Sequence, residues 1–179
     1  MTQDKGWKLP RNKKLYIVIL VVVAGLGWFY MDMDKGPKEV GPVIGYRAPD
    51  FVVKDMMGNE ASLSGQRGKP VFINFFATWC TFCRVEMPHI EALYRELGDE
   101  IEFMVVDLME SKETVEAFFQ SQGLTVPVYL DTKGASGHSY EVRGIPASFF
   151  VDRKGVIQDV ALGALTEARL RQALGKIHH

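Results

Sequence analysis

Residues 71–83 read VFINFFATWCTFC and contain the features that decide the fold. Val71–Phe76 is a nearly continuous apolar run, which is typical of a β-strand that is covered on both faces. Cys80 and Cys83 follow this run, where we expect a helix that starts at about Cys80 and ends at Leu97. The stretch therefore predicts a buried strand that leads directly into a helix whose first turn carries both cysteines.

Strands and helices alternate on both sides of this stretch. A helix is expected after each of the capping residues Ser111 and Thr166. Pro127 indicates that one strand lies at a sheet edge or begins after the proline. The expected strands are 51–53, 101–106, 126–130, 147–151 and 156–162, the last two forming an antiparallel hairpin. This order predicts an α/β fold with a mixed central β-sheet and helices on both of its faces.

The composition is that of a globular chain with few chemical options outside the cysteine pair. The 179 residues suffice for one domain of ordinary size, and 47% hydrophobic with 24% charged residues excludes a disordered chain. A formal net charge of −1 argues against a general polyanion binder, so we expect no nucleic-acid partner. Two cysteines are too few for a four-cysteine zinc or iron–sulfur site, and we expect no metal and no bound cofactor.

Charge and hydropathy divide the N-terminal part of the chain. Residues 1–14 carry five basic side chains and one acidic one, and residues 15–31 are seventeen positions without a charge. As a helix, such a run spans about 25 Å, which is just enough for a bilayer core. The positive-inside rule then predicts a cytoplasmic basic tail at 1–14 and a single-pass transmembrane anchor at 15–31. Glycines and prolines indicate a linker at 32–46. Residues 47–179 are then expected to form an extracytoplasmic domain that the anchor holds at the cell membrane.

Two other interpretations of the apolar run stay open. A cleaved signal peptide needs only residues 15–23 as its apolar region, and Ala24 offers a small residue near a cleavage point. A buried core helix is the other alternative, although nothing else in the N-terminal region could cover it. An anchor and a signal peptide would both export the domain to a compartment where cytosolic glutathione does not keep thiols reduced.

Two cysteines at the start of a helix are suited to disulfide exchange. Free N–H groups and the positive end of the helix dipole stabilise a thiolate, which is the attacking species. Cys80 lies at the open end and can attack a substrate disulfide, and Cys83 can then resolve the mixed disulfide. We therefore expect a redox-active Cys80–Cys83 disulfide. Half of a zinc site, completed by His89 and His138, and a purely structural disulfide are the alternatives.

Four segments carry a resemblance to a known family. They are residues 75–83 together with Pro88, residues 110–112 (ESK), residues 126–131 (VPVYLD) and residues 140–152 (YEVRGIPASFFVD). They resemble the thioredoxin superfamily and, within it, the ResA/TlpA group of membrane-anchored or periplasmic thiol–disulfide oxidoreductases. The resemblance runs from about residue 45 to residue 174. It implies a thioredoxin-like fold and a protein-disulfide oxidoreductase whose redox centre is the cysteine pair.

The resemblance also implies a substrate-binding surface around the cysteines. Pro146 matches a cis-proline loop that faces the active site, which would turn the backbone of Ile145 toward an extended substrate segment. Trp79 matches an exposed aromatic residue that touches partners, and Thr81 and Phe82 lie between the cysteines. The alternatives are an ordinary trans proline at a strand start and a tryptophan that packs in the core.

Glu86 matches the acidic residue of this group's active site. It lies three residues after Cys83, so both share one face of the helix, and partial burial would raise its pKa and let it exchange a proton with a cysteine. Asn74 occupies the place where many thioredoxins carry a buried aspartate, which strengthens the case for Glu86. A solvated carboxylate is the alternative for Glu86 and is our expectation for Glu91 and Glu96.

The resemblance implies partners and a direction of electron flow. The expected function is reduction of disulfides in exported proteins, with apocytochrome c during cytochrome c maturation as one substrate and a membrane thiol–electron carrier as reductant. The Thr81-Phe82 dipeptide, which tunes the redox potential, lacks the proline common in reducing members, so a disulfide donor of the same fold stays open. A non-catalytic binding module and a peroxiredoxin-type peroxidase are further alternatives, although the latter needs T-x-x-C and Thr78 lies only two positions before Cys80.

Overall fold

The computed structural model describes residues 17–23 and 39–178. Residues 17–23 are helical, and the remaining described residues belong to a compact unit that spans Pro37–His179. Within the described ranges, no helix combines the length and the apolar character needed to cross a bilayer. The basic tail expected at 1–14, most of the anchor expected at 15–31 and the first part of the linker expected at 32–46 lie outside the described residues.

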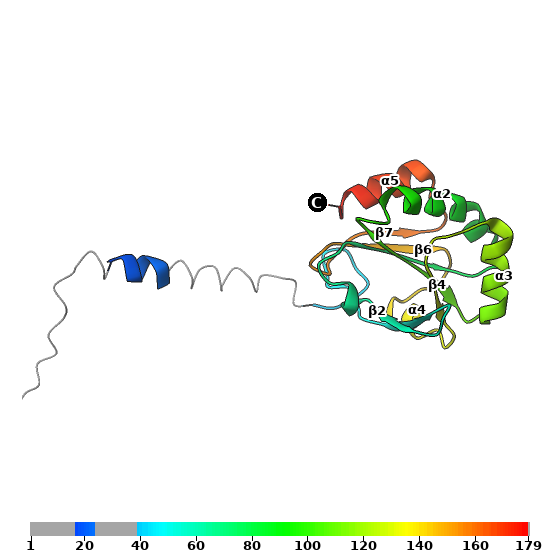
Figure 1. The fold of residues 1–179 in the computed structure, drawn as a ribbon, viewed down its shortest axis with the longest axis horizontal. Helices are drawn as coiled ribbons and strands as arrows, with labels where there is room; N and C mark the ends of the chain where they lie inside the picture. The colour runs from blue at the N-terminus through cyan, green and yellow to red at the C-terminus, as the bar shows by residue number, and fades with distance from the viewer. Residues whose placement is uncertain (1–16, 24–38, 179) are drawn as a thin grey trace, which may run out of the picture. The chain divides into compact units, whose positions relative to one another are not determined.

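In the described part of the chain, seven strands form one mixed sheet with the spatial order β2–β1–β5–β4–β3–β6–β7. Figure 1 shows this sheet between its helices. Strands β3, β4 and β5 are parallel to one another, whereas β1, β6 and β7 run antiparallel to their neighbours. The α/β fold with a mixed sheet and the β6–β7 hairpin are therefore confirmed. The strands are β1 (Val52–Asp55), β2 (Glu60–Ser62), β3 (Val71–Phe76), β4 (Glu102–Leu108), β5 (Val128–Asp131), β6 (Ala147–Val151) and β7 (Ile157–Leu162).

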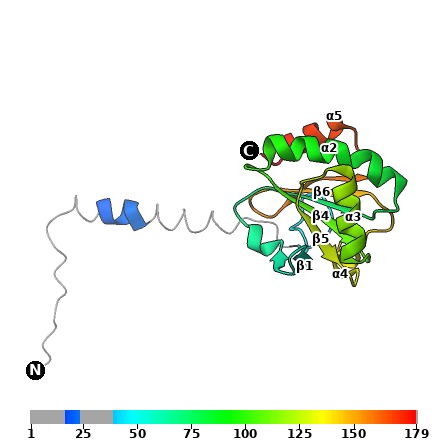
Figure 2. The same cartoon turned by 45° about the vertical axis from the view of Figure 1, so that its right-hand side comes forward.

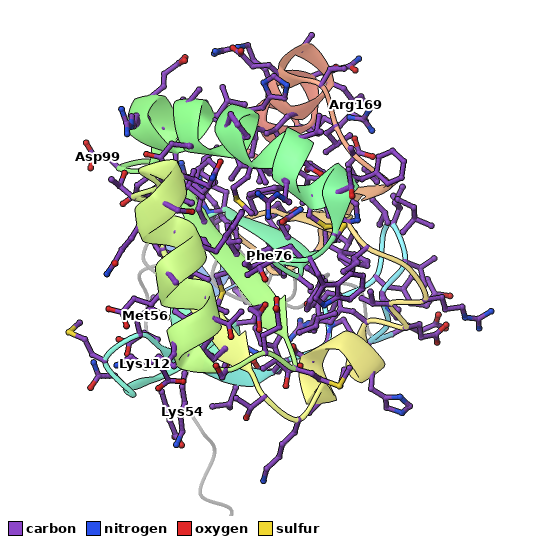
Figure 3. The ribbon with its side chains drawn as sticks, turned by 90° about the vertical axis from the view of Figure 1, so that its right-hand side faces the viewer. Lys54, Met56, Phe76, Asp99, Lys112 and Arg169 are labelled. Atoms are coloured by element: carbon purple, nitrogen blue, oxygen red, sulfur yellow. A yellow bond between two sulfur atoms is a disulfide. The ribbon has the colours of Figure 1, made fainter. Side chains whose placement is uncertain are left out.

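Helices cover both faces of the sheet, as Figures 1 and 2 show. On one face, α2 (Thr81–Leu97), α3 (Lys112–Gln122) and α5 (Glu167–Gly175) pack against a core that includes Phe76. Phe76 lies at the end of β3, beneath α2 and beside α3 in Figure 3. On the other face lie α4 (Ala135–Ser139) and the short 3₁₀ turn η1 (Ser64–Gln66). Strand β3 is buried on both faces by these two layers, as its apolar run predicts.

The expected capping residues set the helix ends. The side-chain oxygens of Ser111 and Thr166 each accept a hydrogen bond from the backbone N–H three residues further on. Helix α3 ends at Gly123, whose positive φ of 64° favours glycine. Strand β5 begins at Val128, directly after Pro127, because a proline cannot donate a hydrogen bond to the strand ladder. These expectations are confirmed.

The sequence pattern predicts neither β2 nor α4. Strand β2 has three residues, none of them buried, so it carries no apolar pattern. Helix α4 is ASGHS, in which serine, glycine and histidine are weak helix formers, and it is held by the carboxylate of Asp131. That carboxylate accepts hydrogen bonds from the backbone N–H groups of Ala135, Ser136 and Gly137 and from the Ser136 hydroxyl. The helix therefore depends on a tertiary contact that propensity does not contain.

The folded domain begins before residue 47, which the sequence takes as its first residue. The N–H of Arg47 donates to the carbonyl of Glu39 at 3.0 Å, and the N–H of Gly45 donates to the carbonyl of Ile157 at 2.8 Å. Ile157 in turn donates to the carbonyl of Tyr46 at 3.0 Å. Residues 39–46, which their glycine and proline content assigns to the linker, are therefore part of the folded domain: Gly45 and Tyr46 bond to Ile157 of β7, and Glu39 bonds to Arg47.

Candidate active site

Strand β3 leads to the two cysteines at the start of helix α2. Cys80 is the N-cap residue of α2 and forms a disulfide with Cys83, the two Cα atoms being 5.3 Å apart. The backbone N–H of Cys83 points at the Sγ of Cys80 at 3.2 Å. Cys80 is 6% exposed and Cys83 only 2%. The first cysteine is thus the more accessible one, and the N–H directed at its sulfur favours a thiolate there.

A cis-proline loop faces this disulfide. The Ile145–Pro146 peptide bond is cis, and the carbonyl oxygen of Ile145 lies 3.7 Å from the Sγ of Cys80. Pro146 is buried at the start of β6, whereas Ile145 is half-buried. Ile145 and Pro146, which the sequence analysis names, therefore lie next to the reactive sulfur, although Ile145 is 65 positions away from Cys80 in the chain. Their backbone lies beside the Sγ of Cys80, the atom that would attack a substrate disulfide.

Three large apolar side chains are exposed around the cysteine pair. Trp79 is 71%, Phe82 68% and Val85 61% exposed, and Thr81 is exposed as well. Trp79 is thus not a core residue. Val85 was not among the residues that the sequence named, although its position three residues after Phe82 places both on one helix face. Three exposed apolar side chains within seven residues suit contact with a protein segment better than with a small polar ligand.

Glu86 is completely buried beneath this surface, and so is not solvated. The Nδ2 of Asn74 lies 3.5 Å from its Oε1 and 2.9 Å from the hydroxyl of Ser148. Burial raises the pKa of Glu86 to about 7, against the lowering effect of hydrogen bonds from the backbone of Leu165 and from Ser148. The carboxyl group therefore changes charge near neutral pH, one helix turn from Cys83.

A second carboxylate, to which the sequence gives no role, fixes the turn before the cysteines. Glu110 accepts hydrogen bonds from the backbone N–H of Thr78 at 2.5 Å and from its hydroxyl at 2.7 Å. The N–H of Glu110 in turn donates to the buried carboxyl group of Asp107 at 3.0 Å. Burial, with a further contribution from Glu110, raises the pKa of Asp107. The only signal in the sequence is the ESK segment that carries the family resemblance.

The expectation for Glu91 is wrong, whereas Glu96 is exposed and pairs with Arg171. Glu91 is buried, and its Oε2 accepts hydrogen bonds from the N–H groups of Thr125 and Val126 at 2.8 and 2.9 Å. These donors belong to the segment between α3 and β5, so Glu91 connects that segment to α2, the helix that carries the cysteine pair. It is a buried structural carboxylate that also pairs with the exposed Arg95.

The chain is similar to known proteins over most of its length. Residues 44–160 match the AhpC/TSA family, a range that contains the cysteine pair and the cis-proline loop. The chain is 38% identical to the thioredoxin-like protein YneN of Bacillus subtilis, over 88% of this chain and 94% of that protein. It is 33% identical to the thiol-disulfide oxidoreductase ResA of Geobacillus thermodenitrificans, over 90% of this chain and 92% of that protein. A thiol:disulfide interchange protein of Chlorobium tepidum superposes with a TM-score of 0.65 at 27% identity, covering 74% of this chain and 96% of that structure.

Proposed function

This chain belongs to the AhpC/TSA family of thioredoxin-like proteins and is a thiol–disulfide oxidoreductase, and from that premise we propose that it reduces disulfide bonds in exported proteins. The observation that carries the proposal is the Cys80–Cys83 disulfide at the start of α2, beside the Ile145 carbonyl and bordered by Trp79 and Phe82. This surface presents an apolar platform and free backbone next to a reactive sulfur, which fits an extended protein segment that contains a disulfide.

In the proposed reaction, the thiolate of Cys80 attacks one sulfur of the substrate disulfide. A mixed disulfide forms, and the second substrate sulfur leaves as a thiolate that takes up a proton. Deprotonated Cys83 then attacks the Sγ of Cys80, which forms the Cys80–Cys83 disulfide and releases the first substrate sulfur as a thiol. The substrate gains two electrons and two protons, which the protein loses. A membrane thiol–electron carrier then returns the cysteine pair to the dithiol.

Glu86 is proposed as the base that accepts the proton of Cys83 in the second step. It is buried, it lies three residues after Cys83 on α2, and its pKa of about 7 suits a group that both takes and returns a proton. Asn74, which donates toward Glu86, has no acid form and so cannot replace it.

Replacing Glu86 with glutamine should slow the resolving step by about 10²-fold at pH 7 and remove its pH inflection near 7. In the native protein this rate rises as the carboxyl group ionises, and in Glu86→Gln the rise moves up to the pH at which the Cys83 thiol ionises unaided. The measurement is release of substrate from a preformed mixed disulfide by rapid mixing. Glu96→Gln on the exposed face of α2 is the matched control. An unchanged inflection in Glu86→Gln would show that Glu86 does not take this proton.

The same raised pKa affects stability with a defined sign. The folded state holds the Glu86 proton more tightly than the unfolded state does. The contribution of protonated Glu86 to the free energy of unfolding is therefore fully present below the ordinary glutamate pKa, and it is lost as pH rises through about 7. In Glu86→Gln, the free energy of unfolding measured in urea should not fall over this pH range. This measurement reports the protonation of Glu86 independently of the rate of the resolving step.

An extracytoplasmic, membrane-anchored location is part of the proposal. The uncharged run at 15–31 and the basic residues at 1–14 support it. The resemblance to the ResA/TlpA group supports apocytochrome c as one substrate, because its paired cysteines must be reduced before haem attaches. A disulfide donor of the same fold is the second candidate, favoured by the absence of proline from the Thr81-Phe82 dipeptide.

Alkylation of thiols in intact cells tests the direction of electron flow. If the protein is a reductase, most of the Cys80–Cys83 pair is trapped as the dithiol, and a strain that lacks the protein makes less haem-bearing cytochrome c. An added small dithiol should restore cytochrome c in that strain, because it replaces the missing reductant. A mostly oxidised pair together with normal cytochrome c in the deletion strain would instead identify a disulfide donor.

A further inference from the structure

A second distinctive surface lies at the end of the sheet opposite to the cysteine pair. The last residue of β3, Phe76, leads to the active site. The first residue of β3, Val71, lies at the other end of the strand and pairs with Val151, the last residue of β6. A hollow of about 330 Å³ lies beside these two residues. Since β3 has six residues, this end of the domain is about 20 Å of strand away from the active-site turn.

The hollow is rich in basic side chains although the domain as a whole carries more acidic than basic ones. Two aspartates also line it: Asp50 accepts hydrogen bonds from the N–H groups of Phe51 and Ser64, and Asp152 from those of Lys154 and Val156. Among the described residues, Arg67 and Lys154 have no ion pair, whereas Lys69 pairs with Glu102. We call the five basic residues that line the hollow the basic cluster: Arg47, Arg67, Lys69, Arg153 and Lys154. Five basic residues against two aspartates give the hollow an excess of positive charge, which can attract an anion from outside.

Exposed apolar side chains adjoin the basic cluster. In the loop 40–46, Val40 is 62%, Val43 52% and Ile44 56% exposed, and Tyr46 is partly exposed. The loop is held in shape by its hydrogen bonds to the start of β7, so these side chains are presented on a fixed backbone. Apolar side chains beside free basic ones are the combination by which proteins lie on an anionic lipid surface.

The position of this loop in the chain identifies the occupant. Residues 32–38 are all that separates residue 39 from the uncharged run at 15–31. Seven residues reach at most about 25 Å when fully extended. If residues 15–31 are the anchor of the proposed function, on which this inference rests, the chain tethers residue 39, at the start of this loop, within about 25 Å of the end of the anchor.

We propose that the loop 40–46 and the basic cluster dock on anionic phospholipid headgroups of the membrane that anchors the chain. The loop inserts its apolar side chains among the headgroups, and Arg67 and Lys154 bind the phosphates. Docked in this way, the domain turns the Cys80–Cys83 pair away from the bilayer, toward soluble substrates.

The test uses the full chain in lipid nanodiscs that contain a gadolinium-chelating lipid, with and without 30 mol% of phosphatidylglycerol. Paramagnetic broadening of backbone amide signals reports which residues approach the lipid. We expect signals of residues 40–47, 65–69 and 153–155 to broaden at least threefold more in anionic than in neutral nanodiscs, and 0.5 M salt to remove most of that difference. Signals of residues 79–85 should show no such difference.

Two variants separate docking from folding. Val43→Ser/Ile44→Ser and Arg67→Gln/Lys154→Gln should each lower the broadening of residues 40–47 at least threefold. Both should reduce a small soluble disulfide at the native rate, because neither touches the cysteine pair. Lys133→Gln/Arg143→Gln, which removes two exposed charges near the other end of the sheet, is the matched control and should broaden like the native chain.

The outcomes distinguish this inference from the proposed function. A chain that alkali removes from vesicles would overturn the anchor and the docking together. A chain that stays in the membrane but shows equal broadening in anionic and neutral nanodiscs would overturn the docking alone. Reductase activity is measured on the same samples and does not depend on either result.

Discussion

Replacing Cys83 with alanine should convert the protein from an enzyme that turns over into one that accumulates as mixed disulfides through Cys80. Cys80 is the more exposed of the two residues and its Sγ lies beside the Ile145 carbonyl, so we expect a substrate to meet this sulfur first. Without Cys83, the mixed disulfide has no internal thiol to resolve it, and turnover should fall on the order of 10³-fold or more. Covalent complexes that disappear on reduction should then be recovered from cells and identified by mass.

Cys80→Ala is the matched control for this experiment. It removes the more exposed cysteine and leaves Cys83, which lies in the first turn of α2 and is only 2% exposed. We expect Cys80→Ala to lose turnover to the same degree but to form no covalent complexes. Complexes that form through Cys83 in Cys80→Ala would reverse the assigned roles. The absence of complexes in Cys83→Ala would favour a structural disulfide in a binding module.

The features that sequence predicted well are those that depend on neighbouring residues. The apolar run of β3, the capping oxygens of Ser111 and Thr166 and the break at Pro127 act within a few positions, so periodicity and local chemistry are enough to place them. The same holds for the cysteine pair, whose N-cap geometry is set by the turn between β3 and α2. Pro146 was found through family resemblance, because nothing local marks a cis bond.

The features that sequence missed are carboxylates that accept hydrogen bonds from distant backbone. Asp131 holds the short helix α4, Glu110 holds Thr78 before the cysteines, and Glu91 holds Thr125 and Val126. In each case the need arises from an N–H group that the fold would otherwise bury without a partner, and such a need has no periodic signature. Glu91 did carry one local signal, since it continues the buried stripe of Cys83, Met87 and Ile90 at helical spacing.

Glu91→Ala should cost about 3 kcal/mol of unfolding free energy, although the residue lies outside the active site. The substitution leaves the N–H groups of Thr125 and Val126 without their acceptor, and a buried unsatisfied donor costs about 1–3 kcal/mol. It also removes the contacts of Oε1 with the Thr125 hydroxyl at 2.6 Å and with Arg95 at 2.7 Å. Urea unfolding of the oxidised protein at pH 7 measures the loss.

The pH dependence of this loss separates the carboxylate from the space that its side chain fills. Burial alone would raise the pKa of Glu91, but the hydrogen bonds from Thr125, Val126 and Arg95 outweigh it and lower the pKa below the ordinary value. The carboxylate therefore stabilises the fold above the ordinary glutamate pKa, and this stability is lost as pH falls through the lower folded pKa. The gap between native protein and Glu91→Ala should thus narrow below about pH 4. Glu91→Gln, which keeps one acceptor oxygen, should fall between the two. Glu116→Ala, at an exposed position of α3, should behave like the native protein. A gap that stays constant down to pH 3 would mean that packing, and not the charged acceptor, accounts for the contribution of Glu91.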